Sequence, residues 1–559
     1  MGGNGSAADL VFVNGAVYTV DAMRSWAQAV AVRDGRVALV GTDDAVRAAI
    51  GQGTEVIDLA GRMLIPGFQD AHVHPVSGGM DMLQCDLHEL HAPEDYLLRV
   101  KTYAEEHPER EWILGGGWSM DQFPGGTPTK DALDAIVPDR IVYLPNRDGH
   151  SAWVNSRALE VAAISKDTPD PPDGRIERDG HGDPSGALHE GAAELVGALA
   201  PEPTPEEMDR AVLEAQRYLH ALGITAWQDA AVSVSSWGDY YSAYRRTAER
   251  GDLTARVIGA LWWDRERGED QIEELERLRD EGRVGRFAPT SVKIMQDGVC
   301  ETFTAAVLEP YLDDEGRPTD RRGISFVEPE ALKTYVTALD ARGFQVHFHA
   351  LAERAVRECL DAVEAALRAN GPGDGRHHLA HLQVIHPDDV PRFRALRAVA
   401  NAQPLWAAHE PQMDDLTIPF LGDPRWRWQY PFGALVRTGA SLCFGSDWPV
   451  STPDPLQELH VAVNRVMPPD YPYGDQGEAP VFLPEERLDL ATSIAAFTIG
   501  SAYVNHLDDV TGSIEVGKLA DLTVVDRDLF AHPAEEIAGA RVDATFVEGI
   551  PVFERPDAG

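Results

Sequence analysis

Lysine is rare in this 559-residue sequence, where only six of the 49 basic residues are lysine and the other 43 are arginine. Acidic residues outnumber the basic ones by 91 to 49, which gives a net charge of −42 and an isoelectric point near 4.7. Because there is also no basic run, we do not expect the chain to bind nucleic acid. An acidic surface is more typical of solubility or salt tolerance than of a site for a cationic ligand.

Cysteine and long apolar runs are also scarce. The four cysteines are scattered without Cys-x-x-Cys spacing, which argues against a disulfide framework and against a thiolate zinc site. No stretch approaches the roughly 18 apolar residues of a membrane span. The first eight residues lack the basic and apolar regions of a secretory signal. We therefore expect a cytoplasmic protein that binds no membrane.

Short strands separated by turn residues are predicted at both ends of the chain. Near the N-terminus, segment 9–13 precedes Asn14-Gly15 and segment 29–33 precedes Asp34-Gly35, and both dipeptides are typical of two-residue hairpins. The C-terminus has a similar pattern, with strands predicted at 520–525 and 544–548. Since neither end is long enough to build a core alone, we expect the two ends to pair.

The middle of the chain alternates predicted strands with predicted helices. Eight apolar strand candidates occur at 64–74, 223–229, 255–263, 291–297, 345–349, 378–382, 399–405 and 442–447. Helical patterns lie between them, over 270–280, 329–342 and 353–370. This eightfold alternation predicts an α/β protein with a (β/α)8, TIM-like barrel.

A long segment interrupts the alternation after the first barrel strand. Residues from about 80 to 215 are rich in Gly, Pro, Trp and Asp, which indicates an inserted domain rather than a structureless loop. We therefore predict three parts: a composite β-sandwich of 1–62 with 508–559, a barrel over 63–507, and an insertion over 80–215 that covers the active site.

Two histidines alternate in the first predicted barrel strand, in Asp70-Ala-His72-Val-His74. Residues i and i+2 of a strand share a face, so His72 and His74 point to the same side. Two such imidazoles can hold one metal ion. A pair of hydrogen-bonded histidines near a turn is the alternative.

Four more polar residues fall toward the carboxyl ends of other predicted strands: Lys293, His349, His381 and Asp447. These ends form the catalytic face of a (β/α)8 barrel, so we expect the four residues to join the histidine pair. Lys293 is conspicuous because its flanks are apolar, although a snorkelling surface lysine is the alternative. His347 shares a face with His349 and is a second candidate ligand.

Several motifs of the chain resemble the amidohydrolase superfamily. Residues 63–74 resemble its first metal-binding strand, and residues 512–521 resemble its second-half sandwich signature. Motifs at 115–118, 148–155, 293–298 and 445–449 are most similar to the amidohydrolase family 3 branch, which includes N-substituted formamide deformylase. The similarity runs essentially from end to end. One departure is Ala352-Glu353, which stands where the branch usually has Gly-Asp.

The resemblance implies a metal site with one or two divalent ions. The implied ligands are His72, His74, Lys293, His349, His381 and Asp447. In this arrangement Lys293 is carboxylated and bridges the two ions. A charged ammonium about 4 Å from a divalent ion would be repelled by roughly 8 kcal/mol at an effective dielectric constant of about 20, so the lysine must be neutral, carboxylated or elsewhere. With an unmodified lysine, a one-metal site remains open. Imidazole and carboxylate ligands without thiolates favour zinc.

We interpret the chain as a metal-dependent hydrolase of a carbon–nitrogen bond other than a peptide bond. A metal lowers the pKa of a water molecule to about 7, and Asp447 would act as the general base. The leading substrate is an N-substituted formamide with an apolar or aromatic substituent. The same site could serve deamination, cyclic amide or ester hydrolysis, or decarboxylation. Outside enzymes, a metal-dependent binding protein is the alternative.

The insertion is expected to contribute substrate contacts through Trp118 and His150. Core packing is the alternative for the tryptophan, and an ordinary loop histidine is the alternative for His150. By analogy with the family, we also expect a homodimer.

Overall fold

The computed structural model describes residues 7–88, 90, 92–123, 126–147, 149, 151–171, 174–233, 238–301, 303–469, 471 and 480–556. Contacts divide the chain into two units, one made of Met1–His74 with Gln216–Gly559 and the other of Pro75–Ala215. Each unit has its own sheets and its own apolar core.

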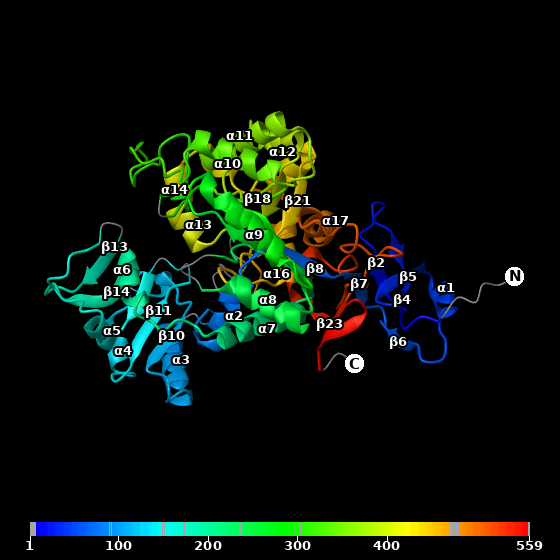
Figure 1. Ribbon diagram of the computed structural model, residues 1–559, viewed down its shortest axis with the longest axis horizontal. Coiled ribbons are helices and arrows are strands. Elements are labelled where there is room, and N and C mark those ends of the chain that lie inside the picture. The colour runs from blue at the N-terminus through cyan, green and yellow to red at the C-terminus, as the bar shows by residue number, and fades with distance from the viewer. Residues whose placement is uncertain are drawn as a thin grey trace. The chain divides into compact units, whose positions relative to one another are not determined.

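An eight-stranded, all-parallel sheet forms the centre of the first unit. Its strands, in spatial order, are β21 (Ser441–Phe444), β20 (Val399–Ala402), β19 (His378–His381), β18 (Gln345–Ala350), β17 (Phe287–Met295), β16 (Arg256–Trp262), β15 (Ile224–Asp229) and β8 (Phe68–Val73). Helices α9 (Ile272–Gly282), α10 (Pro329–Ala341) and α11 (Glu353–Asn370) follow β16, β17 and β18 (Figure 1). The predicted α/β class and TIM-like barrel are confirmed.

The sequence of α11 shows how a helix is fixed to this sheet. Its buried apolar residues recur at every turn of the helix, at Ala355, Val356, Cys359, Leu360 and Val363. This spacing gives an apolar stripe on one side of the helix, and the stripe must be buried against the barrel. The other charged residues of α11 are partly or fully exposed, whereas Glu353 and Glu358 are buried.

The first barrel strand begins later than the sequence predicted. A single strand was expected over 64–74, but the chain forms β7 (Met63–Pro66) and then β8, separated by Gly67. Only β8 enters the barrel, because β7 pairs with β22 (Leu522–Val525) in another sheet. A side chain at position 67 would lie 2.4 Å from the Thr225 hydroxyl, so glycine is required where the chain passes between the sheets.

Two smaller sheets in the first unit are built near the chain ends. The six-stranded sheet runs β24 (Ile550–Glu554), β23 (Val542–Val547), β22, β7, β2 (Ala16–Tyr18) and β3 (Trp26–Ala27), so red and blue strands lie together in Figure 1. The four-stranded sheet runs β5 (Arg36–Gly41), β4 (Ala29–Arg33), β1 (Leu10–Val13) and β6 (Glu55–Asp58). Phe12, Leu64, Leu522 and Phe546 share one core. The β-sandwich and its residue limits stay predictions.

One of the two predicted N-terminal hairpins forms. Asp34 and Gly35 join β4 to β5 with φ angles of 51° and 71°, as a two-residue turn with two left-handed residues requires. The hairpin predicted at Asn14-Gly15 is wrong, since β1 and β2 lie in different sheets. Both edges of β1 are already paired, with β4 and β6, which leaves no edge for β2.

The second unit contains a six-stranded sheet. Its order is β13 (Gly174–Arg178), β14 (Pro184–Glu190), β12 (Ser151–Val154), β11 (Ile141–Pro145), β10 (Trp112–Gly116) and β9 (Cys85–Asp86). Helix α3 (Pro93–Glu106) contributes Tyr96 and Val100 to its core. The expectation that this insertion covers the barrel mouth concerns the arrangement of the two units, and it stays a prediction.

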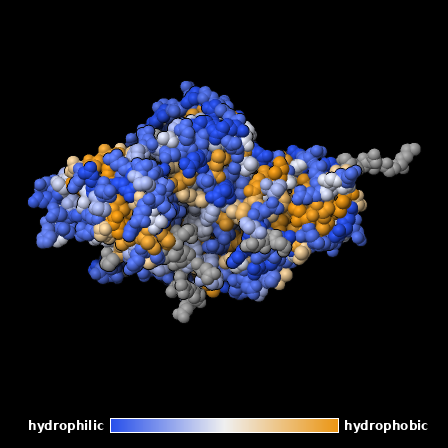
Figure 2. All heavy atoms as spheres, turned by 90° about the horizontal axis from the view of Figure 1, so that it is seen from below, coloured by the Kyte–Doolittle hydropathy of each residue, from blue (hydrophilic) through white to orange (hydrophobic). Residues whose placement is uncertain are grey.

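Hydrophilic residues dominate the face of the molecule drawn in Figure 2, where apolar residues gather in separate patches. This distribution agrees with a chain in which a quarter of the residues are charged. Among the helices of the described ranges, none is long and apolar enough to cross a membrane.

A buried ion pair joins the barrel to the strands near the C-terminus. Arg256 at the start of β16 places Nη1 2.6 Å from Oδ2 of Asp521, and it also pairs with Glu548. The Asp521 side chain is fully buried, and it accepts further hydrogen bonds from the Thr511 hydroxyl and the Glu548 amide. Asp521 ends the 512–521 motif, so this ion pair gives that motif a structural role.

Replacing Arg256 with alanine would leave the Asp521 carboxylate buried without a cation. We expect the free energy of unfolding to fall by about 3–5 kcal/mol, because an uncompensated buried charge is costly. Urea unfolding followed by circular dichroism measures this change. Arg277→Ala is the matched control, since Arg277 forms an exposed pair with Glu281, and it should cost less than about 1 kcal/mol. Equally small losses in both variants would contradict the prediction.

Candidate metal centre

The six predicted metal ligands all lie at or near the carboxyl ends of barrel strands. His72 is in β8 with His74 just after it, Lys293 is in β17, His349 is in β18, His381 ends β19, and Asp447 follows β21. The imidazoles of His349 and His381 are neighbours with ring centroids 4.5 Å apart, although the parallel register of β18 and β19 pairs His381 with Ala350 and His349 with Ala380. The strand ends bring these side chains to one end of the barrel, and His381 departs from regular strand geometry there with a positive φ angle.

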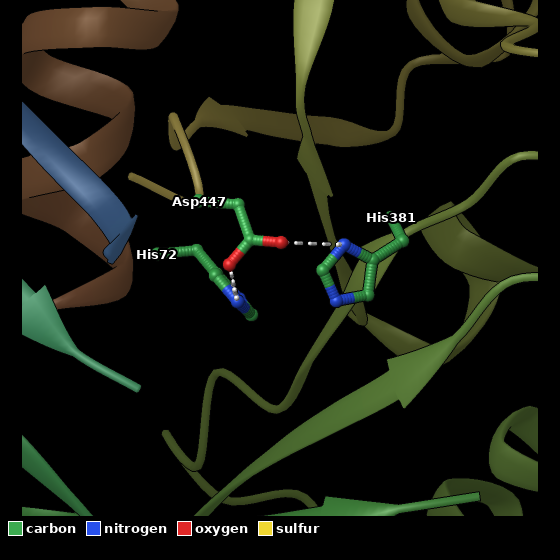
Figure 3. Close-up of side chains that lie close together, drawn as sticks. All are labelled: His72, His381 and Asp447. Atoms are coloured by element: carbon green, nitrogen blue, oxygen red, sulfur yellow. Dashed lines mark ion pairs between the residues drawn. The ribbon is translucent and has the colours of Figure 1, made fainter. Parts of the chain in front are cut away.

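The carboxylate of Asp447 is the point on which the histidines converge. Its Oδ1 lies 3.1 Å from Nε2 of His72 and 3.2 Å from Nε2 of His74. Its other oxygen, Oδ2, lies 3.9 Å from Nδ1 of His381. Figure 3 shows the His72 and His381 imidazoles facing the two oxygens of this one carboxylate. The histidines of β8 and the histidine of β19 thus approach Asp447 from different sides.

These separations suit a divalent ion. Tetrahedral zinc with bonds of about 2.0–2.1 Å holds its ligand atoms about 3.3 Å apart, close to the distances from Asp447 Oδ1 to His72 and His74. One ligand atom each from His72, His381 and Asp447 can be chosen so that all lie within 4.8 Å of one another. Nδ1 of His381 is buried and has no hydrogen-bond partner in the described part of the chain, as expected of a nitrogen that binds an ion.

Burial prepares the imidazoles for metal binding. Desolvation, with the nearby Lys293, lowers the pKa of His72 to about 3. Desolvation also places the pKa of His381 well below its ordinary value. Both rings are therefore neutral at physiological pH, which is the form that binds a metal ion.

Lys293 is a buried residue of this centre and not a surface lysine. Only 2% of it is exposed, and burial lowers the pKa of its ammonium to about 7 although Asp447 opposes this shift. A substantial fraction of neutral amine at neutral pH follows, and a neutral amine is what carboxylation by carbon dioxide requires. The snorkelling alternative does not describe this position.

Asp70 joins the two strands that carry the ligands, which the sequence analysis did not predict. Its carboxylate accepts hydrogen bonds from the His72 amide at 3.0 Å and from the Ser446 hydroxyl at 2.6 Å. The Asp447 amide in turn donates to the His72 carbonyl at 2.8 Å. We call residues 70–74 with 445–448 the closing seam. The signal was available, because Asp70 shares a strand face with His72.

A glycine and two strained residues shape the ligand loops. A Cβ at Gly445 would lie 2.5 Å from the His72 nitrogen, so only glycine permits the close approach at the closing seam. His381 and Asp447 have positive φ angles of 78° and 58°, which cost about 1–3 kcal/mol each in residues other than glycine. The Gln403 side chain stabilises the first of these by accepting a hydrogen bond from the His381 amide at 2.7 Å.

A further carboxylate near the ligands belongs to Asp297, for which the sequence analysis predicted no role. Its oxygens accept hydrogen bonds from the amides of Leu351 and Ala352, and Oδ1 lies 3.5 Å from His349 Nδ1. Glu353, the departure from the family pattern, is fully buried beside this region and accepts a hydrogen bond from the Leu308 amide. Burial raises the pKa of the Glu353 carboxyl. The hydrogen bond from the Leu308 amide to Glu353 supports a loop and does not involve a metal ligand.

The two predicted substrate contacts, Trp118 and His150, both come from the insertion. Trp118 is fully buried in the core of the second unit, where its indole N–H donates to the Leu144 carbonyl at 2.7 Å. This is the core-packing role that the sequence analysis gave as the alternative, and substrate contact stays a prediction. His150 lies outside the described residues. An aromatic neighbour of the ligands comes instead from the barrel, because Trp406 stacks on His381 with ring centroids 5.6 Å apart.

Comparisons with known proteins agree with this geometry. Residues 55–553 match the amidohydrolase family. Protein LONG AFTER FAR-RED 3 of Arabidopsis thaliana is 31% identical over 98% of this chain and 91% of its own length. The N-substituted formamide deformylase of Arthrobacter pascens is 28% identical over 98% of both chains. The crystal structure of an uncharacterized metal-dependent hydrolase from Pyrococcus furiosus has a TM-score of 0.72 and 25% identity, covering 93% of this chain and 99% of that one.

Replacing His72 with alanine should remove a ligand and leave the barrel folded. Loss of a residue that only hydrogen-bonds to a ligand lowers metal affinity by roughly 10- to 100-fold. We expect loss of His72, a ligand itself, to lower zinc affinity by more than this. Elemental analysis after dialysis, with circular dichroism for the fold, measures both effects. His220→Ala is the control, because His220 is equally buried but, within the described residues, its imidazole hydrogen-bonds to the Ile224 carbonyl and the Thr254 hydroxyl. Full zinc content in the His72 variant would show that this residue is no ligand.

Proposed function

Because the chain belongs to the amidohydrolase family and is thus a metal-dependent enzyme that hydrolyses carbon–nitrogen bonds, we propose that its substrate is an N-substituted formamide. The observation that carries the proposal is the convergence of His72, His74 and His381 on one buried carboxylate at the carboxyl ends of the barrel strands. The likeness to N-substituted formamide deformylase, over nearly the full length of both chains, supports the choice of substrate class.

The proposed ligand set assigns each residue a place. His72, His74 and Asp447 would hold a first divalent ion, zinc, and His349 with His381 would hold a second. When bound, such an ion acidifies a water molecule and polarises the amide carbonyl. Asp447 accepts the proton of the attacking water through its carboxylate and then passes it to the leaving nitrogen. The products are formic acid and the free amine, which become formate and the ammonium form of the amine when the acid gives up its proton, so every atom of the water is accounted for.

Lys293 has its own role in this proposal. Its neutral amine attacks carbon dioxide, a nitrogen–carbon bond forms, and one proton is released to solvent. The resulting carbamate is an anion, which replaces a cation that would repel both ions. The depth of Lys293 in the barrel and its lowered pKa support this modification.

The proposed activity can be tested with a formamide that contains no peptide bond. The metal-loaded protein should release formate from N-benzylformamide, removal of metal by a chelator should abolish release, and added Zn²⁺ should restore it. Asp447→Asn should lower kcat by about 100- to 10,000-fold, since it removes the proton acceptor. Asp414→Asn, which changes an exposed acid paired with His409, should leave kcat unchanged. A protein with verified zinc that releases no formate would overturn the substrate assignment.

Carboxylation of Lys293 can be tested apart from turnover. After exchange with ¹³C-labelled bicarbonate in the presence of Zn²⁺, the protein should show one extra carbonyl resonance. This resonance should vanish in Lys293→Ala together with the second metal ion. It should also be absent in Lys293→Arg, because a guanidinium stays charged and cannot carry the carboxyl group. Lys333→Ala, at an exposed lysine of α10, is the control and should keep both. Wild-type protein with two zinc ions and no such resonance would exclude the carbamate.

A further inference from the structure

Beneath the metal centre lies a chain of buried polar side chains that no step of the proposed reaction uses. It begins at two backbone carbonyls, of Arg376 and Val504, and passes through Gln345, Gln228 and His347 to His72. The four side chains are 0–4% exposed, so each hydrogen bond must be satisfied within the protein.

The direction of every bond in this chain follows from its first member. Backbone carbonyls can only accept, so the Gln345 atom that lies 2.9 Å and 2.6 Å from them must be the amide nitrogen. Gln345 therefore presents its oxygen to Gln228, and the Gln228 atom 3.1 Å away is again the nitrogen. That nitrogen also donates to Asn505 Oδ1 at 2.9 Å. The oxygen of Gln228 is left to face the barrel interior.

The same logic assigns the protons of two histidines. Gln228 Oε1 lies 2.6 Å from Nδ1 of His347, so Nδ1 must carry the proton and Nε2 of this neutral ring must accept. Nε2 of His347 lies 2.7 Å from Nδ1 of His72, so the His72 proton is on Nδ1. Nε2 of His72 is then a lone pair that points at Asp447 Oδ1 from 3.1 Å. Two acceptors at this distance repel unless a cation lies between them.

We propose that Gln228 and His347 are positioning residues that fix the tautomer of His72, so that its Nε2 always offers a lone pair to the first metal ion. The proposal rests on the metal-dependent function above. It also settles the role of His347, because the Nε2 lone pair of His347 is occupied by His72 and is not free for a metal. A partner hydrogen bond of this kind orients a ligand and increases its basicity.

Two substitutions at position 347 show whether His347 acts as a hydrogen-bond acceptor or only fills space. His347→Leu removes the acceptor and should weaken Zn²⁺ binding by about 10- to 100-fold, as measured by competition with a chromogenic chelator. His347→Gln returns an oxygen that can accept from His72 Nδ1, and it should retain most of the affinity. If the glutamine variant binds Zn²⁺ as weakly as the leucine variant, His347 does not act through this hydrogen bond.

Substitutions at position 228 provide a second test that does not alter an imidazole. Gln228→Met should weaken Zn²⁺ binding, whereas Gln228→Glu, protonated in this buried place, can donate to Gln345 and accept from His347 and should bind like the wild type. Gln271→Met is the matched control, because this buried amide, within the part of the chain that the structure describes, bonds to Asp264, Arg267 and Gly268 of its own segment. Equal affinities in the Gln228→Met and Gln271→Met variants would overturn the proposal.

Nitrogen NMR of protein labelled with ¹⁵N-histidine reads the tautomer directly. In the wild type, with and without Zn²⁺, His347 should carry its proton on Nδ1 alone, and Gln228→Met should lose this preference. The His347 signals are identified by their absence in His347→Gln. A proton on Nε2 of His347 would overturn the proposed polarity. If the wild type takes up no zinc, the metal-dependent function fails, but the tautomer measurement still tests the hydrogen-bond chain.

Discussion

The contact between the first and last barrel strands is the constraint on which the site depends. At the closing seam, Asp70 binds Ser446, the Asp447 amide binds the His72 carbonyl, and Gly445 leaves room for the His72 backbone. Residues about 375 positions apart in the chain thereby become neighbours. Without this seam, Asp447 would not lie beside His72 and His74, and these three ligands would be apart.

Burial then gives the site its chemical character. A surface histidine exchanges its proton with water, but the imidazoles of His72 and His381 are neutral because desolvation penalises their charged form. Neutral imidazoles placed against a carboxylate form a set of acceptors, and such a set is stable only with a cation. The positive φ angles of His381 and Asp447 show that the fold accepts backbone strain to bring these acceptors together.

Much of the barrel could be predicted from local pattern. Apolar strands alternating with amphipathic helices such as α11 predicted the eight-stranded sheet, and the i, i+2 spacing predicted that His72 and His74 share a face. The predictions failed where strand pairing with distant segments outweighed a local sequence signal. Asn14-Gly15 is a strong hairpin signal, yet both edges of β1 are occupied. Likewise, the single strand predicted over 64–74 belongs to two sheets, because the chain passes Thr225 at Gly67.

The sequence by itself determined which residue types reach the carboxyl ends of the strands, because strand periodicity and strand order along the chain are local properties. Only the tertiary structure decided which of these residues meet, how deeply Lys293 is buried and which nitrogen of His72 faces Asp447. Gln228 and Gln403 carry no pattern that marks them as partners of a metal site, and the strand face that Asp70 shares with His72 does not show that Asp70 binds Ser446. Their roles arise from hydrogen bonds between distant segments, and those bonds exist only once the barrel has closed.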